Sequence, residues 1–184
     1  MSERILFAEL EPLLATPEPP QLGPGPRPGV RSIEDLRATL QRSLTNRVSR
    51  AHEGRLIEAV VLLWHDHHEP AHSIVQDIEN ADGSFVHGIL HRREPDYGNA
   101  GYWFRRVGRH PSFAILAERV ARLPVDGADH ELKQRLLAGG RWDPFAFIDA
   151  CAEVSRGDES GSRGRFLREV QRQEFEILLE RFCA

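Results

Sequence analysis

Apolar residues in this chain recur at helical spacing, and no segment alternates apolar with polar residues as a half-buried strand does. The clearest pattern is Ala100, Trp103, Phe104 and Val107, which occupy positions i, i+3, i+4 and i+7. Turns of about four residues join such segments, and short connections favour antiparallel helical hairpins. We therefore predict an all-α fold, a single domain of about eight or nine helices in antiparallel hairpins, without a sustained repeat.

Side chains that cap helices support the same interpretation. Ser32, followed by Asp35, predicts the beginning of one helix. Asp143, followed by Pro144, predicts the beginning of another, because a carboxylate can accept the free N–H groups of a first turn and proline is tolerated there.

A proline-rich segment separates the N-terminus from the rest of the chain. Residues 16–30 contain six of the twelve prolines and have the composition of an extended, polyproline-like linker. Residues 1–15 carry leucines at helical spacing, which predicts a short amphipathic helix. We predict that the linker tethers this helix to an all-helical domain of residues 31–184, and that the linker is mobile or only draped over the surface. The sequence leaves open whether the helix packs on the core of that domain or on a partner.

The composition is that of a globular protein. The 184 residues are 40% hydrophobic and 28% charged, with a net charge of -4, and no apolar run approaches the ~20 residues that span a bilayer. Glu3, Glu9 and Glu11 interrupt the apolar residues of the N-terminus, which argues against a signal peptide. We therefore expect a cytoplasmic protein without membrane association. The acidic balance and the lack of an arginine-rich arm also argue against nucleic acid as a partner.

Functional groups are concentrated between residues 65 and 110. Six of the nine histidines lie between His65 and His91, and arginine, acidic and aromatic residues follow them. No Ser-His-Asp order, glycine-rich phosphate loop or CxxC motif is present, and Cys151 and Cys183 lack an activating context. The sequence therefore offers no candidate for nucleophilic catalysis, and the chemistry of this stretch favours metal binding or ligand recognition.

His87 and His91 form the best candidate pair for a metal. Being four residues apart, they lie about 40° apart around a helix. A helical continuation to Glu94 would place a carboxylate on the same stripe. With His65 or His72 of the preceding hairpin as a further ligand, the set suits a transition metal such as Zn, Fe or Ni. The alternative is that these histidines bond to nearby carboxylates or face water.

The segment His68-Glu69-Pro70-Ala71-His72 matches the HExxH pattern of zinc proteases. That chemistry needs both histidines on one face of an unbroken helix, with the glutamate beside the metal-bound water. Pro70 removes a backbone donor and restricts the conformation of Glu69, so we expect His68 and His72 to belong to different helices. The match is therefore expected to be functionally empty.

A second set of polar side chains surrounds the turn that follows His91. The candidate ligand-binding residues are Arg92, Arg93, Asp96, Asn99, Tyr102 and Arg106. Guanidinium groups bind carboxylates in a bidentate manner, so a small anionic ligand or the acidic tail of a protein partner would fit this set. The alternative is a structural network that pins the turn, with Asn99 capping a helix that begins near Ala100.

The segment GILHRREPDYGNAGYWFRRV, from Gly88 to Val107, resembles one unit of a Sel1-like or tetratricopeptide helical hairpin. Its second helix has the small residue, the aromatic pair and the basic residues of such units. The resemblance covers only this hairpin, whereas a solenoid needs about three stacked repeats. The whole chain is also similar to an uncharacterised bacterial protein family, a resemblance that implies no activity.

These observations support two functions. The first is a non-catalytic binding or scaffold module that uses the His, Arg and acidic surface around residues 87–106. The alternative is a metal-dependent enzyme, such as a hydrolase, with His87, His91 and a carboxylate at its centre. The sequence does not decide between them, and it leaves the oligomeric state open.

Overall fold

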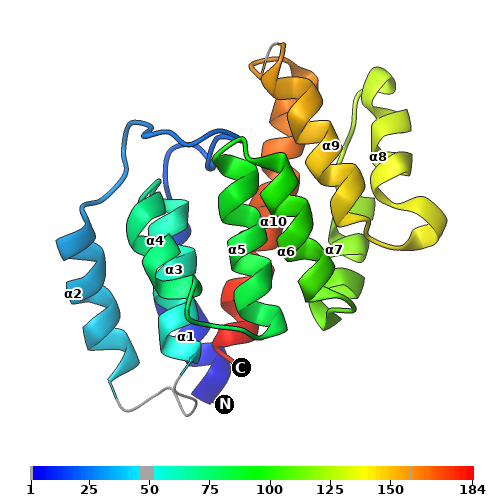
Figure 1. The fold of residues 1–184 in the computed structure, drawn as a ribbon. Coiled ribbons are helices and arrows are strands. Elements are labelled where there is room, and N and C mark those ends of the chain that lie inside the picture. Colours follow the sequence, from blue (N-terminus) through cyan, green and yellow to red (C-terminus); the bar gives the residue numbers. More distant parts are fainter. Residues whose placement is uncertain (1, 46–51, 158) are drawn as a thin grey trace.

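The computed structural model describes residues 2–45, 52–157 and 159–184, and in these ranges it contains helices and no strand (Figure 1). The α-helices are α1 (Ser2–Leu10), α2 (Ile33–Leu44), α3 (Glu53–Trp64), α4 (His68–Val75), α5 (Ala81–Arg93), α6 (Tyr97–Val107), α7 (Pro111–Arg122), α8 (His130–Leu136), α9 (Pro144–Ser155) and α10 (Ser162–Phe182). The 3-10 helices are η1 (Glu11–Leu14), η2 (Gly127–Asp129) and η3 (Ala138–Gly140). The all-α prediction is confirmed. None of the described helices is both long and apolar enough to cross a membrane.

Two hydrophobic clusters share the long C-terminal helix α10. The first cluster lies among α1 to α6, and the second lies among α7, α8 and α9. Helix α10 passes behind α5 and α6 in Figure 1 and contacts α3, α7 and α9. Its Leu167 and Val170 are buried in the second cluster, while Leu178 and Phe182 are buried in the first. One continuous helix therefore holds both clusters in a single unit.

The N-terminal segment packs into the core of the domain, a point that the sequence left open. Leu10 of α1 is fully buried, and Leu13 and Leu14 of η1 belong to the same cluster. Leucines at helical spacing remove apolar surface from water by packing on a neighbour. Here the neighbours are α2, α3 and α10, which α1 or η1 contacts directly.

The proline-rich connector is also fixed to the domain rather than draped over it. Leu22 is buried in the second hydrophobic cluster. Arg27 donates hydrogen bonds from Nη1 to Asp66 Oδ1 at 2.6 Å and from Nη2 to the Trp64 carbonyl at 2.7 Å. The connector forms no helix or strand, and side-chain contacts hold it to the domain instead. The composition of the segment alone does not reveal these contacts.

Three consecutive helices, α4, α5 and α6, form the frame of the candidate site. Asp96 begins α6, because its Oδ1 accepts the N–H of Asn99 at 3.1 Å. The helix therefore begins at Tyr97, which corrects the expectation that Asn99 caps a helix starting near Ala100. Helices α5 and α6 approach closely because Gly88 has no side chain: a Cβ there would lie 2.7 Å from the ring of Phe104.

Candidate metal centre

Helix α5 supplies two of the three histidines of the site. Asn80 caps this helix by accepting the N–H of Gly83 at 2.8 Å. His87 and His91 follow one turn apart, with only 2% and 7% of their surface exposed. Their rings stack with centroids 4.9 Å apart and planes 15° apart. The predicted pair thus lies on one face of one helix, with both rings directed to the same side.

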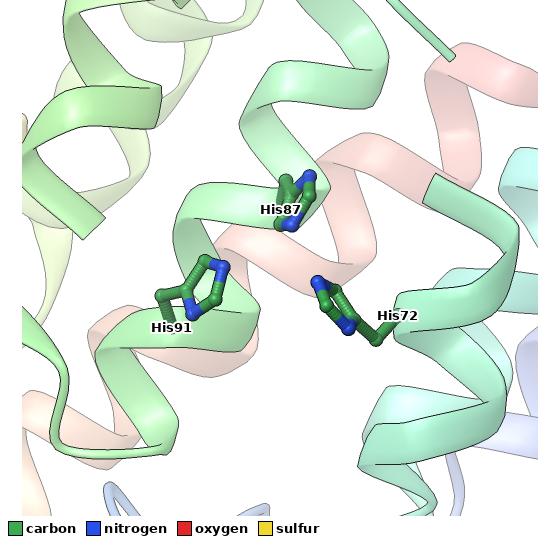
Figure 2. Close-up of side chains that lie close together, drawn as sticks. All are labelled: His72, His87 and His91. Atoms are coloured by element: carbon green, nitrogen blue, oxygen red, sulfur yellow. The ribbon is translucent and has the colours of Figure 1, made fainter. Parts of the chain in front are cut away.

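Helix α4 supplies the third histidine. The ring centroid of His72 lies 4.8 Å from that of His87 and 5.4 Å from that of His91. Figure 2 shows the three imidazoles turned toward one another in the space between α4 and α5. One ring nitrogen from each residue can be chosen so that all three lie within 4.8 Å of one another. The sequence offered His65 or His72 as a further ligand, and the fold brings His72 to the pair.

An indole from α6 covers one side of the cluster. Trp103 stacks on His87 with ring centroids 3.8 Å apart and planes 16° apart. The guanidinium of Arg106 lies 5.4 Å from the centroid of the Trp103 ring, in cation–π range. The spacing of apolar residues predicts that Trp103 lies on the core side of its helix, but only the packing of α6 on α5 reveals that it stacks on His87.

The buried histidines are held in the neutral form. The pKa of His87 is lowered to about 3. Burial is the main cause, and the neighbouring His91 and His72 contribute to the same shift. Burial likewise lowers the pKa of His91, against the opposing influence of Glu94. Both ring nitrogens of His87 and Nδ1 of His91 are buried without a hydrogen-bond partner among the described residues. Neutral imidazole is the form that binds metal, so protons do not compete for these nitrogens near neutral pH.

Two polar residues after α5 lie beside His91. Glu94 Oε2 lies 3.1 Å from His91 Nδ1, although outside the direction of a hydrogen bond to that nitrogen. Asn99 Nδ2 lies 3.4 Å from His91 Nε2. The predicted carboxylate therefore contacts one histidine of the cluster, where it can orient the ring or join the ligands.

His65 does not join the cluster, which corrects its place among the predicted metal ligands. Its Nε2 bonds to the Leu13 carbonyl at 2.8 Å, and its Nδ1 accepts the N–H of Arg31 at 3.1 Å. Both nitrogens are therefore committed to backbone groups of the N-terminal part of the chain. His65 follows the last residue of α3, so it fixes that segment to the core and is not free to bind a metal.

The HExxH segment, residues 68–72, adopts a different backbone conformation from the one expected. His68 and His72 belong to one helix, α4, because Pro70 lies in the first turn, where no N–H partner is required. The expectation of two helices was wrong. His68 nevertheless lies outside the histidine cluster, with Nδ1 bonded to the Asp66 carbonyl at 3.2 Å, and Glu69 is exposed. The residues therefore do not form the arrangement that a zinc protease needs.

Arg92 and Arg93 lie in the protein interior, which corrects their assignment to a ligand-binding surface. Each is 0% exposed. Arg92 donates to both carboxylate oxygens of Glu174, at 3.2 and 2.5 Å. Arg93 donates to Asp66 Oδ1 at 2.6 Å and to the carbonyl of Leu63. The structural alternative holds for these two residues, because both guanidinium groups are buried and already paired with carboxylates inside the fold.

The other four members of the predicted ligand-binding set remain near the surface. Asp96, Asn99, Tyr102 and Arg106 are all exposed. Asp96 is used to cap α6, and Arg106 lies over the rings of Tyr102 and Trp103 at 5.9 and 5.4 Å. Without the two buried arginines, this surface no longer forms the guanidinium cluster on which the anion prediction depended.

Sequence reasoning missed Glu174, the carboxylate that pairs with the buried Arg92. Glu174 lies four residues after Val170 and four before Leu178, on the apolar face of α10. A carboxylate at such a position indicates a buried charge that needs a cationic partner. That spacing is the signal that could have identified Glu174, although it does not say which arginine pairs with it.

Models of known protein families, curated protein sequences and solved structures show no match to this chain. The resemblance of residues 88–107 to a Sel1-like or tetratricopeptide hairpin therefore stays a prediction, as does the likeness to an uncharacterised bacterial family.

Proposed function

We propose that this protein binds one transition-metal ion of the zinc type through His72, His87 and His91. The observation that carries the proposal is the convergence of three imidazoles, in which neither nitrogen of the buried His87 ring has a hydrogen-bond partner within the described part of the chain. A buried polar group left without a partner costs about 1–3 kcal/mol. A bond from one His87 ring nitrogen to a metal ion would give that nitrogen a partner and offset the cost.

The chemistry of the three ligands selects the kind of metal. Imidazole suits Zn, Cu, Fe and Ni, whereas Mg and Ca prefer oxygen ligands. Around tetrahedral zinc, Zn–N distances of about 2.1 Å place the ligand nitrogens roughly 3.4 Å apart. The nitrogens here lie within 4.8 Å of one another, so zinc binding would bring the most distant of them closer by up to roughly 1.4 Å. His72 is the partly exposed member, on a helix of 8 residues, and is the one best able to move.

A metal at this position would join α4 to α5. The histidines belong to different helices, so one ion shared by them links two segments of the chain and stabilises their packing. Glu94 would act next to His91, either as a further ligand or as the carboxylate that orients the ring.

A hydrolytic role is the second candidate, and the number of ligands favours it. Catalytic zinc sites commonly have three protein ligands and leave a position for water, whereas structural sites have four. The described residues bring together three histidines. The binding or scaffold function rests on the exposed residues Asp96, Asn99, Tyr102 and Arg106, whose arrangement supports it less than the histidines support metal binding.

Calorimetric titration of tag-free, chelator-stripped protein with Zn²⁺ tests the proposal. We expect one ion per chain, and loss of that binding in the double variant His87→Ala with His91→Ala. The matched control is His52→Ala with His130→Ala, which removes two exposed histidines outside the cluster and should leave binding unchanged. Zinc at about 100 times its Kd should stabilise the wild type by roughly 2.7 kcal/mol.

Two results would contradict the metal proposal: no binding to the wild type, or undiminished binding to the double variant with a native circular dichroism spectrum. The hydrolase candidate is tested separately, with zinc-loaded protein and a chromogenic ester. Turnover that is lost in His72→Ala, while the control pair retains it, would support hydrolysis. Zinc binding without turnover would leave a metal-binding protein that does not hydrolyse this ester.

A further inference from the structure

Two hollows meet where the turn after α6 faces the segment between η3 and α9. Their volumes are about 510 and 520 Å³. Phe113, Arg141 and Trp142 line both, so the hollows adjoin at these residues. Small-molecule sites have volumes of about 300–1,000 Å³, so either hollow has room for a compact organic molecule.

Aromatic rings form much of the lining. Phe113 is half-buried and Phe145 is 40% exposed, although a large apolar side chain is costly to leave in water. Trp142 is 6% exposed, and its indole Nε1–H is buried without a hydrogen-bond partner among the described residues. Rings arranged in this way favour an aromatic ligand, which can pack edge-on or offset against them.

Three arginines surround the same junction. Arg109 and Arg141 line the first hollow, and Arg105 and Arg141 line the second. All three are exposed, and none forms an ion pair with a described residue. Most of the other arginines that the structure describes are paired with carboxylates, as Arg119 is with Glu180 at 2.5 Å. These three guanidinium groups are therefore available to an anion from outside.

The acidic residues of the hollows do not cancel this charge. Asp143 uses Oδ1 to accept the N–H groups of Phe145 and Ala146, at 2.9 and 3.1 Å, where it caps α9. Glu118 lies 3.7 Å from Arg122 on its own helix. Three arginines against two carboxylates, of which one is a helix cap, leave the junction net positive.

We propose that this junction binds a small aromatic carboxylate, with the ring packed against Phe113, Trp142 and Phe145 and the carboxylate on Arg141. Arginine binds carboxylates through two parallel N–H···O bonds, and Arg141 is the cation shared by both hollows. Arg105 and Arg109 add attraction from either side. The site is separate from the histidine cluster and does not depend on the proposed metal.

Calorimetry with 2-naphthoate and its uncharged counterpart 2-naphthamide tests this proposal. The titrations are made with chelator present, so that the carboxylate cannot bind through a metal at the histidines. We expect naphthoate to bind at least tenfold more tightly than naphthamide. Arg141→Gln should remove most of this preference, because only Arg105 and Arg109 remain to attract the carboxylate, and should leave the affinity for naphthamide unchanged.

The matched control is Arg156→Gln, an equal charge change at an exposed arginine that does not line either hollow. It should bind naphthoate as the wild type does. Phe145→Ala should weaken both compounds, because it removes a ring of the lining. The proposal is overturned if the wild type binds neither compound, if it does not prefer naphthoate, or if Arg141→Gln keeps the preference. None of these results would affect zinc binding at the histidines.

Discussion

Removal of the Glu174 carboxylate should destabilise the fold strongly. Glu174 and Arg92 are both fully buried, and the two N–H···O contacts between them measure 3.2 and 2.5 Å. In Glu174→Ala the guanidinium would stay in the core, bonded to Gln171 Oε1 at 3.2 Å and lying 4.2 Å from the centroid of the Phe147 ring. Neither group carries a negative charge. Truncation of one partner of a buried pair costs about 3–5 kcal/mol, and we expect a loss of that size.

A partly exposed pair with the same shortest contact distance provides the control. Arg119 Nη2 lies 2.5 Å from Glu180 Oε2, but these side chains are 27% and 37% exposed. When Glu180 is removed, water solvates the arginine and Glu176 Oε2 still lies 3.7 Å from its Nη1, so Glu180→Ala should cost only about 0–1 kcal/mol. The difference between the two variants therefore measures the effect of leaving a charge unpaired in the core rather than near the surface.

Urea denaturation followed by far-ultraviolet circular dichroism gives both free energies of unfolding. The double variant Arg92→Leu with Glu174→Leu removes both charges and should recover much of the stability, because no charge stays unpaired in the core. It also keeps the test decisive if Glu174→Ala does not fold. Equal losses for Glu174→Ala and Glu180→Ala would refute the argument, as would a double variant less stable than Glu174→Ala.

Two further predictions concern acid stability and the N-terminal connector. Burial, together with the charge of Arg93, lowers the pKa of His68 to about 4, whereas an unfolded chain has the ordinary pKa of about 6.5. Between these values the unfolded state binds more protons, so the free energy of unfolding should fall as the pH drops through this window and be unaffected by His68 above it. Urea titrations at successive pH values should show a shallower fall for His68→Gln, and an unchanged slope would count against the assignment. In the second test, Asp66→Asn should make residues 16–30 sensitive to limited proteolysis, because Asp66 Oδ1 accepts bonds from Arg27 and Arg93, each at 2.6 Å. If the wild-type connector is cut as fast as that of the variant, Asp66 does not fix it.

The local sequence determined the helices and the placement of His87 and His91 on one face of a helix. Ser32 accepts the N–H of Asp35 at 3.2 Å and Asp143 caps α9, as their sequence positions predict, since a cap depends only on the next few residues. The shared direction of His87 and His91 also follows from the geometry of a single helix. Such features survive any tertiary arrangement that keeps the helix, which is why spacing alone could predict them.

Tertiary structure decided which residues those local features meet. His72 rather than His65 joins the histidine pair, because α4 packs against α5 while His65 bonds to the N-terminal segment. Arg92 is internal because it meets Glu174, which is 82 positions away in the chain. Helical periodicity says which side of a helix is apolar, but the partner of a buried charge depends on how distant segments pack. The sequence therefore determined the helices and the candidate pair, and only the packing of the helices determined which polar residues became a site and which became part of the core.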